Sequence, residues 1–200
     1  NNEKFNWKRM WGAASAVLLY TLWYGWTTNG GDISYGRLNK IPFQEIQWYH
    51  AAAPGLLLLL TRIGVPVSTS FLVLSAFAST FVLEKMLVKS MMGYAVAAVA
   101  AYVIWIGVTK ILDEAKPVAE NHKVYWRVGQ WITTGFLWFT WLSHDMANIA
   151  VFLPREIPFD LMVMVSAVFV FGLGYIFYTG GGKIQNIVIE KHNTRYVRSA

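Results

Sequence analysis

The stretch Gly64-Val65-Pro66-Val67-Ser68-Thr69-Ser70 decides the fold, because it places a polar turn between two apolar pieces of chain, 48–60 and 71–83. At about 1.5 Å per residue each piece makes a helix of roughly 20 Å. That is too short to cross the roughly 30 Å of bilayer hydrocarbon. Two half-length helices joined by a Gly/Pro turn predict a re-entrant hairpin over 46–83. A single span kinked at the proline is the competing interpretation, and Arg62 argues against it.

A second polar interruption, Ser143-His144-Asp145-Met146-Ala147-Asn148, lies inside the apolar segment 128–153. A carboxylate at the centre of a spanning helix costs roughly 2.5–3.5 kcal/mol on insertion scales, so it usually has a functional reason. Broken backbone at membrane depth persists only where it is buried in protein or lines a cavity. Together the two interruptions suggest a transport site.

Composition indicates an all-α polytopic membrane protein. The chain is 56% hydrophobic and 14% charged, with 10 Trp, 10 Tyr and 12 Phe. Its apolar runs are continuous, which argues against a barrel of alternating strands. The net charge of +6 comes from basic residues beside apolar segments, so we expect a bilayer as partner and no nucleic acid. The absence of Cys excludes disulfides and thiolate metal sites.

We expect one transmembrane domain over 1–200, with about four spanning helices, the hairpin, two polar loops and a polar tail. The spans are 11–26, 91–112, 128–153 and 159–179, the loops are 27–45 and 113–127, and the tail is 183–200, with a surface helix at 183–191. If the hairpin returns to the side it entered from, the N-terminus, the second loop and the tail share one side. That side carries eleven of the chain's 17 Lys and Arg, which predicts that it is cytoplasmic. A bacterial inner (plasma) membrane fits this pattern.

The hairpin tip presents three hydroxyls, from Ser68, Thr69 and Ser70, where a helix is expected to begin near Phe71. A helix N-terminus carries unpaired N–H donors and the positive end of the helix dipole, which favours an anion. The alternative is that Ser68 only caps the helix, as Ser and Thr often do.

The second element offers oxygen ligands. Asp145 and Asn148 are three residues apart and share a helix face, and His144 stands four residues before Asn148. If the helix unwinds here, freed carbonyls join the carboxylate and the amide as ligands for a hard monovalent cation. The alternative is a structural ion pair of Asp145 with His144 or with Arg155. Arg155, beside Pro154, is otherwise expected to be an interface anchor rather than an anion ligand.

Read together, the two elements resemble the inorganic phosphate transporter family of sodium- or proton-coupled symporters. Pro66-Val67-Ser68-Thr69-Ser70-Phe71 resembles the family's Pro-Val-Ser-Thr-Thr-His hairpin element over its first four positions. The segment 143–150 resembles the family's Gly-Ala-Asn-Asp-Val-Ala-Asn-Ala element in its Asp, its Ala-Asn and its last Ala. The chain departs from the family at Ser70, at Phe71 and at His144, which stands in place of the first Asn.

The resemblance implies an inverted-repeat symporter that works by alternating access, and not an enzyme. Ser68, Thr69 and Ser70 would bind inorganic phosphate or a similar oxyanion. Asp145 and Asn148, with His144, would bind the coupling ion, either sodium or a proton, and no organic cofactor is expected. The order of the elements places the chain across the join of two repeats, as a fragment with further elements before Asn1 and after Ala200. A homodimer is left open.

The rival class is a non-transporting integral membrane subunit, in assembly or sensing or as a haem protein that uses His50 and His144 as ligands. The two classes differ in one structural expectation. A transporter brings Asp145 and the hydroxyls of 68–70 within a few ångströms of one cavity, whereas the rival places them far apart.

Overall fold

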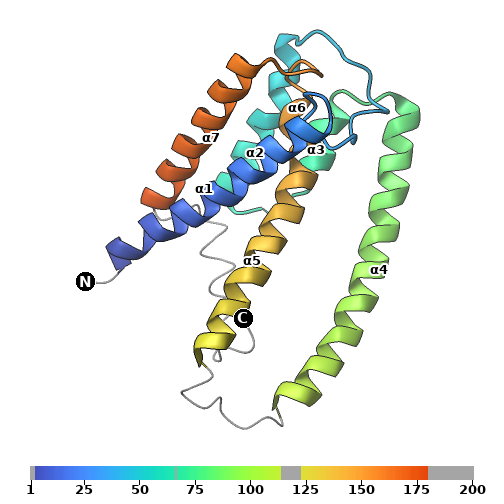
Figure 1. Ribbon diagram of the computed structural model, residues 1–200. Coiled ribbons are helices and arrows are strands. Elements are labelled where there is room, and N and C mark those ends of the chain that lie inside the picture. The colour runs from blue at the N-terminus through green and yellow to red at the C-terminus, as the bar shows by residue number, and fades with distance from the viewer. Residues whose placement is uncertain (1–2, 66, 114–122, 180–200) are drawn as a thin grey trace.

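The protein is all-α throughout the part of the chain that the computed structural model describes, residues 3–65, 67–113 and 123–179, as the sequence predicts. Figure 1 shows the arrangement of its helices. They are α1 (Glu3–Thr28), the 3-10 turn η1 (Trp48–Ala51), α2 (Ala52–Ile63), α3 (Thr69–Ser75), α4 (Thr80–Asp113), α5 (Lys123–Asp145), α6 (Ala147–Ala150) and α7 (Phe159–Tyr178). The expected tail, 183–200, lies outside the described residues.

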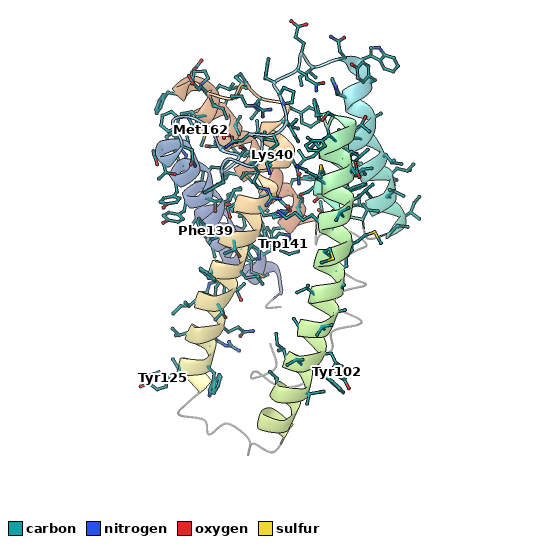
Figure 2. The ribbon with its side chains drawn as sticks, turned by 90° about the vertical axis from the view of Figure 1, so that its right-hand side faces the viewer. Lys40, Tyr102, Tyr125, Phe139, Trp141 and Met162 are labelled. Carbon is teal, nitrogen blue, oxygen red and sulfur yellow. The ribbon has the colours of Figure 1, made fainter. Side chains whose placement is uncertain are left out.

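The four long helices run between two ends of the molecule. At the upper end of Figure 1, α1 and α5 end while α4 and α7 begin; their other ends point downward, with α4 and α5 reaching lower than α1 and α7. Helix α1 packs against both α5 and α7. Helix α4 stands apart, and Figure 2 shows its side chains, Tyr102 among them, projecting outward along the lower half.

Two of these helices are long and apolar enough to cross a membrane: the part of α4 from Thr80 to Val108, and all of α7. They contain most of the expected spans 91–112 and 159–179, and they suggest association with a membrane. The expected spans 11–26 and 128–153 lie mainly in α1 and α5, which do not reach the same hydropathy. Trp, Tyr, Thr and Ser fill many positions of α1 and α5, and these residues lower the mean hydropathy.

Helices α2 and α3 form a helical hairpin that occupies only the upper part of the molecule (Figures 1 and 2). The second arm is shorter than the expected apolar piece 71–83, because α3 ends at Ser75 and the chain turns before α4 begins at Thr80. Two contacts account for the turn. Gln44 Nε2 donates a hydrogen bond of 3.0 Å to the Phe77 carbonyl. The hydroxyl of Ser79 accepts from the Val82 N–H at 3.5 Å, which starts α4 with an N-cap.

The hydrophobic core lies at the upper end and joins α1, the 29–41 loop, α3, α6 and α7. Its largest fully buried side chain is Phe77, which is 2% exposed. The Phe77 ring stacks on His50 at 4.3 Å and 12° and meets Phe152 edge-on at 5.0 Å. The other core members are Leu18, Leu22, Ile33, Leu38, Ile41, Val73, Leu74, Met146, Ala147, Ala150, Val151, Ile157 and Met162.

Two loops close the upper end over this core. Trp26 Nε1 donates to the Ile157 carbonyl at 2.7 Å, and the Ile157 N–H donates to the Gly31 carbonyl at 3.1 Å. Arg155 Nη2 donates to the Ile41 carbonyl at 2.7 Å. Arg155 therefore ties the α6–α7 loop to the loop that follows α1.

Tyr35 fixes the loop against α1. Its hydroxyl donates to the Thr21 carbonyl, and its ring lies over Gly25, where an added Cβ would come within 2.8 Å of the ring edge. Burial raises the pKa of Tyr35 to about 12, so the phenol stays protonated and can donate at physiological pH.

Gly25→Ala is expected to destabilise the protein by about 1–3 kcal/mol, because the new methyl group must displace the anchored Tyr35 ring. Gly12→Ala on the same helix meets open space and is expected to be neutral or slightly stabilising. Thermal unfolding of the two variants in detergent measures the difference. Equal unfolding temperatures would contradict the close packing of Tyr35 on α1.

Candidate functional site

The hairpin tip turns by a left-handed glycine and restarts with a serine cap. Gly64 ends α2 at φ 89° and ψ 20°, and the Val65 N–H donates back to the Leu60 carbonyl at 2.9 Å. A residue with a Cβ is strained at such a φ, so the tip needs glycine here. The Ser68 hydroxyl then accepts from the Phe71 N–H at 3.3 Å and caps α3.

The cap bears on the predicted anion site in two ways. First, Ser68 caps α3, which is the alternative to anion binding that we considered for this residue. Second, helix α3 has only seven residues, from Thr69 to Ser75, so it supplies a weaker dipole than the helix of thirteen residues expected over 71–83. The hydroxyls themselves, rather than a helix end, are therefore the stronger basis for an anion site.

The second element interrupts the helix at the expected place. Helix α5 ends at Asp145 and α6 begins at Ala147. Met146 keeps helical angles of φ −56° and ψ −30°, so the interruption does not bend the chain sharply. The Met146 N–H still donates to the Leu142 carbonyl at 2.8 Å, and the Ala150 N–H donates to the Met146 carbonyl at 2.8 Å. The chain therefore does not unwind at Met146, and the side chains of Asp145 and Asn148, rather than freed carbonyls, are the candidate oxygen ligands.

The tertiary fold brings these two elements together, although 75 residues separate them. The Ser70 hydroxyl lies 3.4 Å from Asp145 Oδ1, in position to donate a hydrogen bond. Asn148 Nδ2 lies 3.5 Å from the Thr69 hydroxyl, in position to donate to it. Helices α3 and α6 pack against each other at this point. The two elements therefore meet within a few ångströms, which is the proximity expected of a transporter, but neither of the two described hollows is lined by them.

One acceptor in this group is left without a donor. Asn148 Oδ1 is buried and has no hydrogen-bond partner among the described residues. Buried polar atoms are nearly always paired with protein, with water or with an ion. An unpaired amide oxygen three residues after the carboxylate of Asp145 suits a cation.

The imidazole of His144 lies against the carboxylate of Asp145. His144 Nδ1 lies 3.0 Å from Asp145 Oδ1, and both side chains are partly exposed, at 47% and 34%. The contact with His144 that was considered as an alternative role of Asp145 is therefore present, on the same carboxylate oxygen that Ser70 approaches. The described residues contain no cluster of three or more His, Asp or Glu that would hold a metal ion.

Arg37, in the loop after α1, is a residue that sequence reasoning missed. Partial burial lowers the pKa of Arg37, and the negative charge of Asp145 opposes that shift. The Arg37 guanidinium, which stays protonated, therefore contributes positive charge to the surroundings of Asp145. Its place in a polar loop gave no signal, because only the folding of that loop over the core brings it near the broken helix.

The remaining candidates have structural contacts. His50 is buried at 1% exposure, accepts the Gln47 N–H on Nδ1 at 2.9 Å and stacks on Phe77. Arg155 Nη2 donates to the Ile41 carbonyl, so its observed contact is with the loop that follows α1. A hollow of about 370 Å³ lies away from both polar elements, between α1 and α5.

Comparison with known proteins finds no match: no family model, no curated protein and no solved structure matches the chain. The likeness to the phosphate transporter family therefore depends on the two short elements and on their convergence.

The convergence is testable because the chain has no native Cys. Ser70→Cys combined with Asp145→Cys is expected to form a disulfide readily under mild oxidation, since the two side-chain oxygens lie 3.4 Å apart. Cleavage of the intervening chain by protease, followed by electrophoresis with and without reductant, detects the bond.

Ser70→Cys with Thr133→Cys is the matched control. Thr133 stands twelve residues before Asp145 in α5, about 18 Å along the helix, and should not cross-link. Similar cross-linking of both pairs, or of neither, would contradict the arrangement of α3 against the end of α5.

Proposed function

We propose that this chain belongs to a secondary active transporter that carries inorganic phosphate or a similar oxyanion together with a cation. The anion binds to the hydroxyls of Ser68, Thr69 and Ser70. The cation, sodium or a proton, binds to Asp145 and Asn148, with His144 beside them. The single observation that carries the proposal is the contact of Ser70 with Asp145 and of Thr69 with Asn148.

The contact supports coupling because of its electrostatics. Two negative charges 4 Å apart repel by about 4 kcal/mol at an effective dielectric constant near 20. An oxyanion on Ser70 would meet that repulsion from Asp145 unless a cation neutralised the carboxylate first. Each ligand then raises the affinity for the other by the same factor, which is thermodynamic coupling of anion and cation.

The position of the site supports alternating access. In the proposed topology α1, α4, α5 and α7 cross an inner (plasma) membrane with the lower end of Figure 1 cytoplasmic, and the hairpin α2–α3 enters from the opposite side and turns back. The tip would then meet the interruption of α5 within the membrane. Secondary transporters bind their substrates at such broken helices and rock one bundle against another around them.

Asp145→Asn is expected to abolish sodium- or proton-driven phosphate uptake, because the neutral amide cannot balance the charge of a cation. Uptake of labelled phosphate into proteoliposomes containing the complete protein measures this, with separate sodium and pH gradients. Asp160→Asn, an exposed acid in the first turn of α7, is the matched control and should transport normally. Full uptake by Asp145→Asn would refute the cation role of this carboxylate.

Thr69→Val with Ser70→Ala is expected to raise the half-saturating phosphate concentration by at least about tenfold. Hydrogen bonds to a charged group are worth about 1.5–3 kcal/mol each, and the variant removes two hydroxyls. Ser143→Ala is the control, since its hydroxyl donates to the Thr140 carbonyl on an exposed helix face. Sulfate as competitor in the same assay distinguishes phosphate from other oxyanions. An unchanged half-saturation value would contradict the anion role of the tip.

A further inference from the structure

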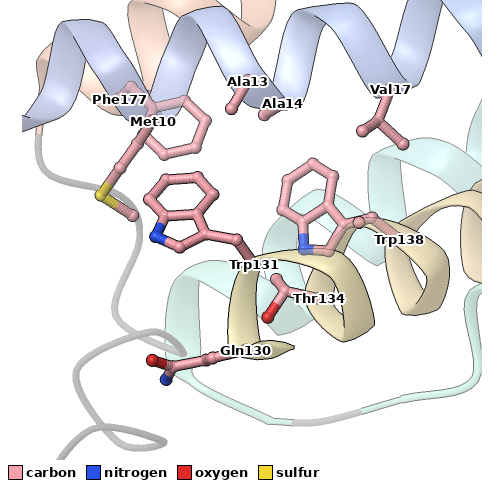
Figure 3. A pocket seen from close by; sticks show the side chains of 10 residues that line it. Met10, Ala13, Ala14, Val17, Gln130, Trp131, Thr134, Trp138 and Phe177 are labelled. Atoms are coloured by element: carbon pink, nitrogen blue, oxygen red, sulfur yellow. The ribbon is translucent and has the colours of Figure 1, made fainter. Parts of the chain in front are cut away.

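A hollow of about 370 Å³ lies between α1 and α5, near the lower part of α1. None of its lining residues belongs to the proposed transport site. Figure 3 shows Trp131 and Trp138 of α5 facing Ala13, Ala14 and Val17 of α1 across it. Its volume lies within the range of about 300–1,000 Å³ that is typical of small-molecule sites. The lining is predominantly apolar, with Gln130 and Thr134 as its polar members.

The hollow continues upward along the same helix pair as a groove. A second depression shares Val17 and Gly135 with the first and extends to Tyr20 and Phe139. From Gln130 to Phe139 the groove follows α5 for about 14 Å. Small residues create it, because a Cβ built on Gly135 would meet nothing within 4 Å. A long, narrow, apolar shape of this kind suits an acyl chain.

The lower mouth of the groove carries positive charge. Arg127 is exposed and stands three residues before Gln130 and four before Trp131, so it lies on the groove face of α5. Before Asp145, α5 contains no acidic residue. Aromatic side chains surround this end, as is usual at the headgroup level of a bilayer: Trp7 packs on Tyr178 at 5.7 Å, and Tyr125 is 76% exposed.

We propose that this groove binds one anionic phospholipid, with an acyl chain along Trp131, Gly135 and Trp138 and the headgroup phosphate at Arg127. The inference rests on the membrane embedding in the proposed function but not on the transport site. Basic residues that flank a groove between membrane helices on the cytoplasmic side bind anionic lipid headgroups, and the lower end is the proposed cytoplasmic side. A zwitterionic lipid also carries a phosphate, but its ammonium group cancels the net negative charge that Arg127 would balance.

Native mass spectrometry of the full chain in detergent tests this, by titration with phosphatidylglycerol or phosphatidylcholine of the same acyl chains. We expect one phosphatidylglycerol to be retained in preference to phosphatidylcholine. Arg127→Gln should weaken phosphatidylglycerol binding about fivefold, the effect of roughly one basic charge near a headgroup. Gly135→Leu should weaken both lipids, because the new side chain fills the groove.

Two matched variants keep the test specific. Lys8→Gln removes a charge from the same end of α1, on the helix face turned away from the groove residues 10, 13, 14 and 17. Gly93→Leu adds the same side chain to α4, at a glycine that also faces open space. Both should retain phosphatidylglycerol like the unaltered chain.

Three outcomes would overturn the proposal: equal retention of the two lipids, no effect of Gly135→Leu, or a second copy of the chain in place of the lipid. Lipid retention is measured without uptake, and uptake variants leave the groove intact. A failure of lipid binding is therefore distinguishable from a failure of the transport proposal.

Discussion

The packing of the Phe77 ring between His50 and Phe152 is the interaction on which the upper end of the structure depends. It fixes the turn between α3 and α4 to the start of the hairpin on one side and to the end of the broken helix on the other. Burial of a Phe side chain is worth about 1.5–3 kcal/mol, and the surrounding core adds Val73, Leu74 and Met146 from the same elements. Once α3 and α6 share this core, their polar ends must meet beside it.

The polar contacts at the edge of that core are long and incompletely satisfied. At 3.4 and 3.5 Å, the bonds of Ser70 to Asp145 and of Thr69 to Asn148 are weaker than typical hydrogen bonds between such groups. Asn148 Oδ1 has no partner within the described chain. Apolar packing, rather than these polar groups, therefore holds the two elements together. Such packing holds these polar atoms in place without pairing them fully with each other. Their remaining hydrogen-bonding capacity is therefore free for a ligand.

The polar groups near Asp145 come from three separate parts of the chain. His144 is its sequence neighbour, Ser70 comes from the hairpin, and Arg37 comes from the loop that Tyr35 and Arg155 hold over the core. The hydroxyl supplies a neutral donor, the imidazole supplies a ring nitrogen, and Arg37 supplies positive charge. The carboxylate consequently sits in a field that depends on how the loop is folded as well as on local sequence.

The sequence by itself determined the helical class, the two apolar helices α4 and α7, the glycine turn at the hairpin tip and the interruption after Asp145. These are local effects of apolar run length, of a residue without Cβ and of polar residues in apolar sequence. The end of α3 could not be predicted, because the turn at 76–79 depends on the Gln44 contact and on the burial of Phe77. Arg37 and the groove between α1 and α5 were missed for the same reason. Only the tertiary structure decided which distant residues meet, since long-range packing selects contacts that no local pattern encodes.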